Sequence, residues 1–378
     1  MSSTRRELPA VLSISRTRVV FGVGTLAELG AMTKREGGCH VLLVTDPGIV
    51  AAGHADRAVG SLRNAGLDVT VFDAVEENPT MLHVDAGVRV ARQHSIDFLV
   101  GLGGGSAMDC AKGINFILTN GGKMSDYWGI NKAAKPMLPM IAVPTTAGTG
   151  SEAQSFALIC DPVTHQKMAC GDVKAACRWA ILDPDLTMTQ PPAVAAASGI
   201  DAVAHAVETA GTLKRNEVSL EMSRQAWTRL DSAFEKAMRD PRNDDARAGM
   251  LLGAHLAGAA IEQSMLGVAH ACANPLTARL GITHGIAVGA MLPHVVRFNC
   301  ANGDNPYAAV SDDPETLARR IETMLEAGRL PRRLADWDVP EAILPELAVE
   351  AAKQWTAAFN PRPVGSGELL EIYRMAYR

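Results

Sequence analysis

The stretch GIDAVAHAVE, Gly199 to Glu208, is the part of the chain around which the rest is organised. Its run of alanine and valine predicts a helix, and Asp201 and His205, four residues apart, then lie on one face of it. A pair of ligand-type side chains at this spacing is how a helix presents two ligands to one metal ion. Asp201 and His205 are therefore the first half of a candidate metal site.

Two histidines downstream complete the candidate site. His270 in GVAHACANPL and His284 in GITHGIAVG are fourteen residues apart. One unbroken helix would separate them by ~21 Å, whereas the ligands of one ion each lie ~2 Å from it. The helix must therefore end between them, and Gly281, after the apolar run to Leu280, is placed to end it. Three imidazoles and one carboxylate suit ferrous iron or zinc better than magnesium or calcium.

A single histidine among alanines is more often a packing residue than a ligand, so the metal interpretation depends on the whole set. His255 in LLGAHLAGA has no second ligand type three or four residues away, and we expect it only to pack.

Composition limits the class of protein. A chain of 378 residues predicts about two to three domains, and a net charge of -5 of mixed sign gives no basic face for nucleic acid. No apolar run approaches the ~20 residues that span a bilayer. The N-terminal MSSTRRELPA lacks a signal core, and the seven cysteines form no CxxC pair. We therefore expect a cytoplasmic protein with buried thiols.

The first half of the chain alternates apolar strands with amphipathic helices, which is the pattern of a parallel α/β sheet. The predicted helices span residues 55–65 and 81–93, and the predicted strands span residues 40–46, 68–75, 97–102 and 137–143. After Pro191–Pro192 the chain shows helical patterns without a strand signal. The sequence therefore predicts two domains, residues 1–190 and 191–378.

A glycine turn follows the third of these strands, in GLGGGSAMDCAKG. Gly103, Gly104 and Gly105 let the backbone approach a ligand closely, and Ser106 is expected to cap a helix that begins at about Ala107. Backbone amides at such a helix start attract phosphate. The motif is not the GxGxxG fingerprint, so a dinucleotide site and a plain turn both remain open here.

A second polar loop, PTTAGTGSE, follows the fourth strand. Its hydroxyl groups can line a sugar, a phosphate or a nicotinamide amide at the carboxyl edge of the sheet. The alternative is a long turn without a ligand. The hydroxyl-bearing residues are Thr145, Thr146, Thr149 and Ser151.

Several motifs in this order resemble the iron-containing, group III alcohol dehydrogenases. They are GGGSAMDCAK, PTTAGTGSE, the DxxxH of Asp201 and His205, the HGxAVGxMLPHVVRFN that starts at His284, and the FNPRPV that starts at Phe359. The resemblance covers nearly the whole chain. It implies an N-terminal α/β dinucleotide-binding domain and an all-α C-terminal domain, the dehydroquinate synthase-like architecture, with metal and substrate in the cleft between them. It also implies that strands near Val19 to Gly22 pair between subunits, so we expect a homodimer or larger homo-oligomer.

Carried over position by position, the resemblance assigns roles to single residues. The metal ligands would be Asp201, His205, His270 and His284. The pyrophosphate cradle would be Gly103, Gly104, Gly105 and Ser106, and the ribose and nicotinamide loop would be Thr145, Thr146, Thr149 and Ser151. Asn78 and Lys167 would face the cofactor; taken alone, they would be a turn residue before Pro79 and a solvated lysine.

Two positions implied by the resemblance concern cofactor choice and proton transfer. Asp46 would lie near the adenosine ribose and favour NAD over NADP; the alternative is a turn residue before Pro47 and Gly48. Many members carry a proton-relay histidine one helical turn after the third ligand, where this chain has Asn274. His294 is a second candidate relay, although a packed or surface role fits it better.

The sequence thus predicts a metal-dependent, nicotinamide-linked oxidoreductase that interconverts a small alcohol and its aldehyde or ketone. NAD is the expected cofactor, with NADP as the alternative. The expected metal is ferrous iron, with zinc as the alternative, and neither nucleic acid nor a membrane is expected as a partner. A metal-independent oxo-acid reductase of the maleylacetate type and a non-catalytic binding protein on the same fold are the alternatives. The complete set of ligands weighs against the first, and the intact ligands and glycine loops weigh against the second.

Overall fold

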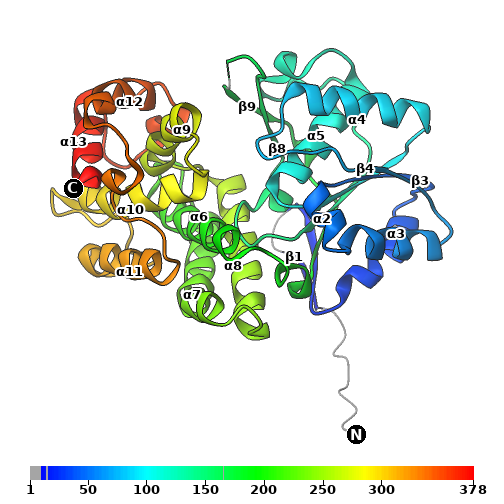
Figure 1. Ribbon diagram of the computed structural model, residues 1–378, viewed down its shortest axis with the longest axis horizontal. Coiled ribbons are helices and arrows are strands. Elements are labelled where there is room, and N and C mark those ends of the chain that lie inside the picture. The colour runs from blue at the N-terminus through cyan, green and yellow to red at the C-terminus, as the bar shows by residue number, and fades with distance from the viewer. Residues whose placement is uncertain (1–9, 14–15, 165) are drawn as a thin grey trace, which may run out of the picture. The chain divides into compact units, whose positions relative to one another are not determined.

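The computed structural model describes residues 10–13, 16–164 and 166–378. The chain divides into two compact units (Figure 1). The first contains the described residues up to Thr145 together with Ser151–Thr189, and the second contains Thr146–Gly150 and Gln190–Arg378. Residues 1–9, which contributed to the cytoplasmic prediction, lie outside the described residues. Among the helices that the structure describes, none is both long and apolar enough to span a membrane.

The segment Thr146–Gly150 belongs to the second unit, whereas the predicted boundary at residues 190 and 191 leaves it in the first. Close backbone approach explains the difference. A Cβ atom on Gly148 would lie 2.6 Å from Ser198 Cβ, and one on Gly150 would lie 2.5 Å from Gly258 Cα. The two glycines therefore let this short segment pack directly on helices of the second unit.

The first unit is built on a seven-stranded sheet. Its pairs are parallel except that β1 and β2 are antiparallel. The strand order is β1 (Ala10–Ser13), β2 (Arg18–Phe21), β10 (Trp179–Leu182), β7 (Met140–Pro144), β5 (Phe98–Gly103), β3 (His40–Val44) and β4 (Asp68–Phe72). The chain passes from β3 to β4 on one side and then to β5 on the other. The strand order thus reverses between β3 and β5, the position where open α/β sheets bind ligands.

Both faces of this sheet are buried, as a parallel sheet requires. Successive residues of β3 alternate between two cores: Leu42 packs with residues of α4 and α5, and Val41 packs with residues of α1 and α3. The helices of this unit are α1 (Leu29–Arg35), α2 (Pro47–Ala51), α3 (His54–Asn64), α4 (Met81–Gln93) and α5 (Gly105–Asn120). The predicted helix at residues 81–93 is confirmed.

Two expectations for the first unit differ from the structure. Gly104 has an extended backbone and Gly105 is already helical, so α5 begins at Gly105 and Ser106 lies inside the helix instead of capping it. A second, three-stranded sheet was not predicted; it consists of β6 (Gly129–Ile130), β9 (Lys167–Gly171) and β8 (Phe156–Cys160). Two residues in β6 and five in β9 are too few to give a clear periodic signal.

Helices are the only regular elements among the described residues of the second unit, which confirms the predicted fold class. Its helices are α6 (Pro192–Gly211), α7 (Glu217–Arg239), α8 (Asp244–Gln263), α9 (Val268–Leu280), α10 (His284–Cys300), α11 (Pro314–Ala327), α12 (Leu344–Ala351) and α13 (Ser366–Tyr377). Every residue of α6 from Gly199 to Gly211 is buried, and α6 packs against α7, α8 and α10. The stretch GIDAVAHAVE therefore lies in the centre of this unit.

Short 3-10 turns connect these elements. They span Thr25–Glu28, Met124–Tyr127, Ser151–Ala153, Val173–Ala175 and Pro184–Thr187 in the first unit, and Leu334–Trp337, Glu341–Ile343 and Trp355–Phe359 in the second.

Candidate active site

Helix α6 presents Asp201 and His205 on one face, as their spacing predicts. Asp201 Oδ1 lies 3.6 Å from His205 Nε2, and both side chains are buried. Helix α6 has no side-chain cap at its N-terminus. Its stability comes instead from burial of an almost wholly apolar segment against α7, α8 and α10. The first two candidate ligands are therefore held by packing.

The predicted helix break is also confirmed. Helix α9 ends at Leu280, Gly281 takes the left-handed conformation with φ 67°, and α10 begins at His284. His270 Nε2 lies 3.5 Å from Asp201 Oδ1, and the His270 and His284 ring centroids are 5.4 Å apart. Residues from three helices thus meet at Asp201.

The spacing of these atoms fits one metal ion. A tetrahedral site with ligand bonds of about 2.1 Å has ligand atoms about 3.4 Å apart, close to the 3.5 and 3.6 Å measured around Asp201 Oδ1. Ligand atoms of Asp201, His270 and His284 lie within 4.8 Å of one another. Asp201 Oδ1 and His270 Nε2 are buried and have no hydrogen-bond partner among the described residues. Such atoms are costly to bury unless something binds them.

The charges in this cluster also favour a cation. Burial opposes ionisation of Asp201, but the three imidazoles around it hold its pKa below the ordinary range. Burial likewise opposes charge on His270, yet the Glu208 and Asp201 carboxylates raise its pKa to about 9. The pKa of His205 is lowered, mainly by burial. A metal ion bound here would take the place of a proton on His270.

Glu208 is a functional residue that the sequence analysis missed. Its Oε2 accepts a hydrogen bond from His270 Nδ1 at 2.5 Å, and its Oε1 accepts one from the Ala269 backbone N–H at 2.6 Å. Ala269 is in the first turn of α9, whose N-cap residue Gly267 has no side chain. Glu208 therefore caps α9 from another helix and fixes the His270 ring. Its position seven residues after Asp201, two turns along the same helix, is the signal that could have found it.

Asn274, His294 and His255 are not among the residues that meet at Asp201. Asn274, one turn after His270, donates from Nδ2 to Gln354 Oε1 at 3.0 Å. His294 is ten residues after His284 on α10, which places it about 15 Å along the helix. Burial and nearby Arg297 lower its pKa to about 4, so it does not titrate near neutral pH. His255 is fully buried in α8.

The predicted glycine turn stands at the reversal point of the first unit's sheet. Gly103 ends β5 with φ +147°, and a Cβ there would lie 2.9 Å from Ala107 Cβ and 3.1 Å from Asp46 Oδ2. The N-cap residue of this 16-residue helix, Gly104, has no side chain and so makes no side-chain cap bond to its first backbone amides. A close backbone turn followed by an uncapped helix start fits a phosphate.

Asp46 lies next to this turn, at the end of β3. Its Oδ1 accepts a hydrogen bond from the Ile49 N–H at 3.0 Å and so caps α2, which confirms the turn interpretation. Oδ2 faces Gly103. One carboxylate therefore serves a structural purpose and also lies beside the candidate cofactor turn.

The other predicted cofactor residues fall into two groups. Thr145 is buried and its backbone N–H donates to Gly103 O at 2.9 Å, whereas Thr146 and Thr149 are half-buried. Asn78, with φ 53°, forms the turn before Pro79, whose carbonyl accepts from Cys160 N–H at 2.8 Å. Cys160 also pairs with Lys167 in the small sheet. Asn78 and Lys167 are thus brought to the same strand end.

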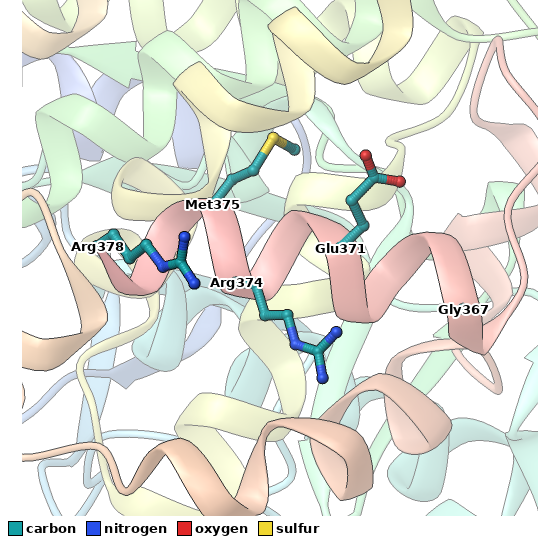
Figure 2. Close-up of a pocket in the computed structure, with 5 residues that line it drawn as sticks. All are labelled: Gly367, Glu371, Arg374, Met375 and Arg378. Carbon is teal, nitrogen blue, oxygen red and sulfur yellow. The ribbon is translucent and has the colours of Figure 1, made fainter.

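A hollow of about 310 Å³ lies on the surface of α13 (Figure 2). It is lined by Gly367, Glu371, Arg374, Met375 and Arg378, and none of them is a predicted site residue. Because one helix supplies all of its lining, it has no converging groups that would bind a substrate.

Comparison with known proteins gives consistent matches along the chain. Residues 16–184 match the family model described as iron-containing alcohol dehydrogenase, and residues 195–377 match that described as Fe-containing alcohol dehydrogenase family, C-terminal. The chain is 34% identical over 366 residues to alcohol dehydrogenase 4 of Schizosaccharomyces pombe, covering 94% of this chain and 87% of the relative. It is 31% identical over 370 residues to the NAD-dependent methanol dehydrogenase of Bacillus methanolicus, covering 94% and 97%. The solved structure of a 1,3-propanediol oxidoreductase matches with a TM-score of 0.90 and 32% identity, covering 98% and 99%.

Proposed function

Because the chain belongs to the iron-containing alcohol dehydrogenase family, we propose that it is a metal-dependent, NAD-linked oxidoreductase that interconverts a small alcohol and its aldehyde or ketone. The observation that carries the proposal is the meeting of the buried residues Asp201, His205 and His270 with the half-buried His284. A metal-independent reductase or a binding protein would have no use for buried ligand atoms without hydrogen-bond partners.

The four side chains would hold the metal, which when bound supplies Lewis-acid stabilisation of charge on the substrate oxygen. We propose ferrous iron, in keeping with the family, although zinc accepts the same donors. Asp201 contributes the one negative charge among the ligands. Glu208 would keep a proton on His270 Nδ1, so that the Nε2 lone pair would be available to the metal.

The first unit would bind the nicotinamide cofactor. Gly103, Gly104, Gly105 and Ser106 form the start of α5, where backbone amides would hold the pyrophosphate. A reduced nicotinamide bound there would supply the hydride for the carbonyl carbon of an aldehyde, and the carbonyl oxygen would need a proton. Asn274 occupies the relay position but cannot titrate near neutral pH, so water or a cofactor hydroxyl would carry that proton.

We predict that Asp46→Gly relaxes a preference for NADH over NADPH. A hydrogen bond to a charged acceptor is worth about 1.5–3 kcal/mol, so the ratio of the two kcat/KM values should fall roughly 10- to 100-fold. Glycine is a tolerable N-cap, which leaves α2 nearly as stable. The matched control is Asp313→Gly, which removes the equivalent cap of α11 in the second unit. A wild-type enzyme that uses NADPH as well as NADH would refute the role of Asp46.

Subunit structure and location are also part of the proposal. The strand near Val19 to Gly22 expected to pair between subunits is β2, and it already pairs with β1 and β10 within the chain. Strand β1 is the edge of the seven-stranded sheet instead and offers backbone groups to a second copy, which supports a homodimer or larger homo-oligomer. All seven cysteines, each among the described residues, are free thiols, which supports the cytoplasm.

The experiment that tests the proposed activity is a screen of small aldehydes and alcohols with each nicotinamide cofactor, followed at the nicotinamide absorbance band. Ferrous and zinc ions are added separately to metal-depleted protein. We expect turnover that depends on one of these ions. Turnover that is unchanged in metal-depleted protein would favour the metal-independent alternative, and no turnover with any substrate would favour the binding protein.

A further inference from the structure

Lys112 on α5 is completely buried, and oxygen atoms accept from all three of its ammonium N–H groups. Nζ donates to Ser151 O at 2.7 Å, to Ser151 Oγ at 2.8 Å and to Phe156 O at 2.9 Å. An ammonium has three donors and no acceptor. Lys112 therefore has no donor left for a ligand, and its contacts all lie within the first unit.

The Ser151 hydroxyl also has its hydrogen-bonding groups occupied by side chains of the first unit. It accepts from Lys112 and donates to Asp109 Oδ1 at 2.5 Å. A hydroxyl has one donor, and the residue is only 5% exposed. Ser151 therefore has no donor for a phosphate, ribose or amide oxygen of a cofactor, although the family resemblance places it in the cofactor loop.

Both ends of the hydroxyl-rich loop, Thr145 to Ser151, are attached to the same part of the first unit. At its start the Thr145 N–H donates to Gly103 O, just before α5 begins. At its end Ser151 is held by Asp109 and Lys112, which lie about one and two turns into α5. Helix α5 and the turn before it therefore set where the loop begins and where it ends.

We infer that Asp109, Lys112 and Ser151 form a buried clamp that positions the hydroxyl-rich loop, so that Ser151 anchors the loop and does not itself bind the cofactor. This inference rests on the proposed NAD-linked function. The three clamp residues are positioning residues, because none of them has a donor directed to a ligand.

Stability alone does not account for the clamp. Lys112 Nζ lies 3.7 Å from Asp109 Oδ1, with side chains 0% and 11% exposed. The free-energy penalty of removing two charges from water about offsets their attraction, so an apolar pair of similar volume would stabilise the fold equally well. The ion pair with its hydrogen bonds instead gives Ser151 one defined position, which an apolar contact does not.

A double-mutant cycle tests the inference. Asp109→Asn combined with Lys112→Met removes both charges, so that no unpaired charge is left buried. Ser151→Ala is then made in the wild type and in this double variant. Hydride-transfer rate, NAD dissociation constant, metal content and thermal unfolding are measured for each protein. The control is Lys34→Met, which removes an exposed lysine that donates to Ala65 O.

We expect the double variant to keep its metal and to lose roughly 100-fold in hydride-transfer rate, because small misplacements of reacting groups cost about that much. Ser151→Ala should add nothing further in the double variant, since the anchor is already gone. A wild-type rate in the double variant, or a full additional loss from Ser151→Ala, would overturn the clamp. If the double variant does not fold, Asp109→Asn alone replaces it in the cycle. A wild-type protein without NAD-linked turnover would instead refute the proposed function.

Discussion

Replacing Asp201 or His270 with alanine is expected to abolish metal binding and nearly all activity while leaving NAD binding intact. Asp201 Oδ1 and His270 Nε2 lie 3.5 Å apart, so losing either side chain removes one ligand atom from the centre of the candidate metal site. If the metal supplies several kcal/mol of stabilisation, activity should fall at least about 10³-fold. Cofactor binding should persist because the glycine turn and Asp46 belong to the other unit. Elemental analysis and NAD titration measure the two effects separately.

The matched control is His294→Ala. It also removes an imidazole from α10, but about three helical turns from His284, where His294 lines a hollow together with Glu322 and Arg332. Metal content and turnover should stay at wild-type values. An Asp201→Ala or His270→Ala protein that kept a full equivalent of metal would disprove the ligand assignment.

Glu208→Gln is expected to weaken metal binding about 10- to 100-fold, the usual cost of losing a partner of a ligand histidine. The carboxylate accepts two N–H groups, from His270 and from Ala269, whereas an amide has only one oxygen. Glutamine must therefore leave one donor facing its NH₂ group or turn that group to Nδ1, which moves the ring proton to Nε2. Competition with a chelator measures the metal dissociation constant without relying on activity.

Glu217→Gln is the control, because Glu217 is an exposed residue at the start of α7. It should leave metal affinity unchanged. If Glu208→Gln binds metal as tightly as the wild type, then Glu208 only caps α9 and does not fix the tautomer of His270; its effect would then appear in thermal unfolding alone.

The parts of the site that the sequence predicts are those that depend on local signals. The i, i+4 pair of Asp201 and His205 needs only a helix, and the end of α9 needs only a glycine after an apolar run. The alternation of strands and helices predicts the parallel sheet in the same way. Each of these signals is complete within a short window of residues.

The parts that the sequence does not predict depend on contacts between distant residues. Glu208 and His270 are 62 positions apart, and Lys112 and Ser151 are 39 apart. Ser151 is an example. A sequence motif places it in a loop rich in hydroxyl groups, but only the fold shows that its hydroxyl already accepts from Lys112 and donates to Asp109. The glycines of the same loop likewise pack on Ser198 and Gly258.

The central claim is direct hydride transfer between the nicotinamide and a carbonyl carbon in the metal-loaded protein. The most direct measurement uses NADH with deuterium at both positions of nicotinamide C4, a small aldehyde that the enzyme turns over, and protein loaded with ferrous ion. Mass spectrometry of the alcohol then locates the label. We predict one deuterium on the carbinol carbon of every product molecule and none after reaction of unlabelled NADH in heavy water. Alcohol that carries solvent hydrogen at that carbon would contradict the account.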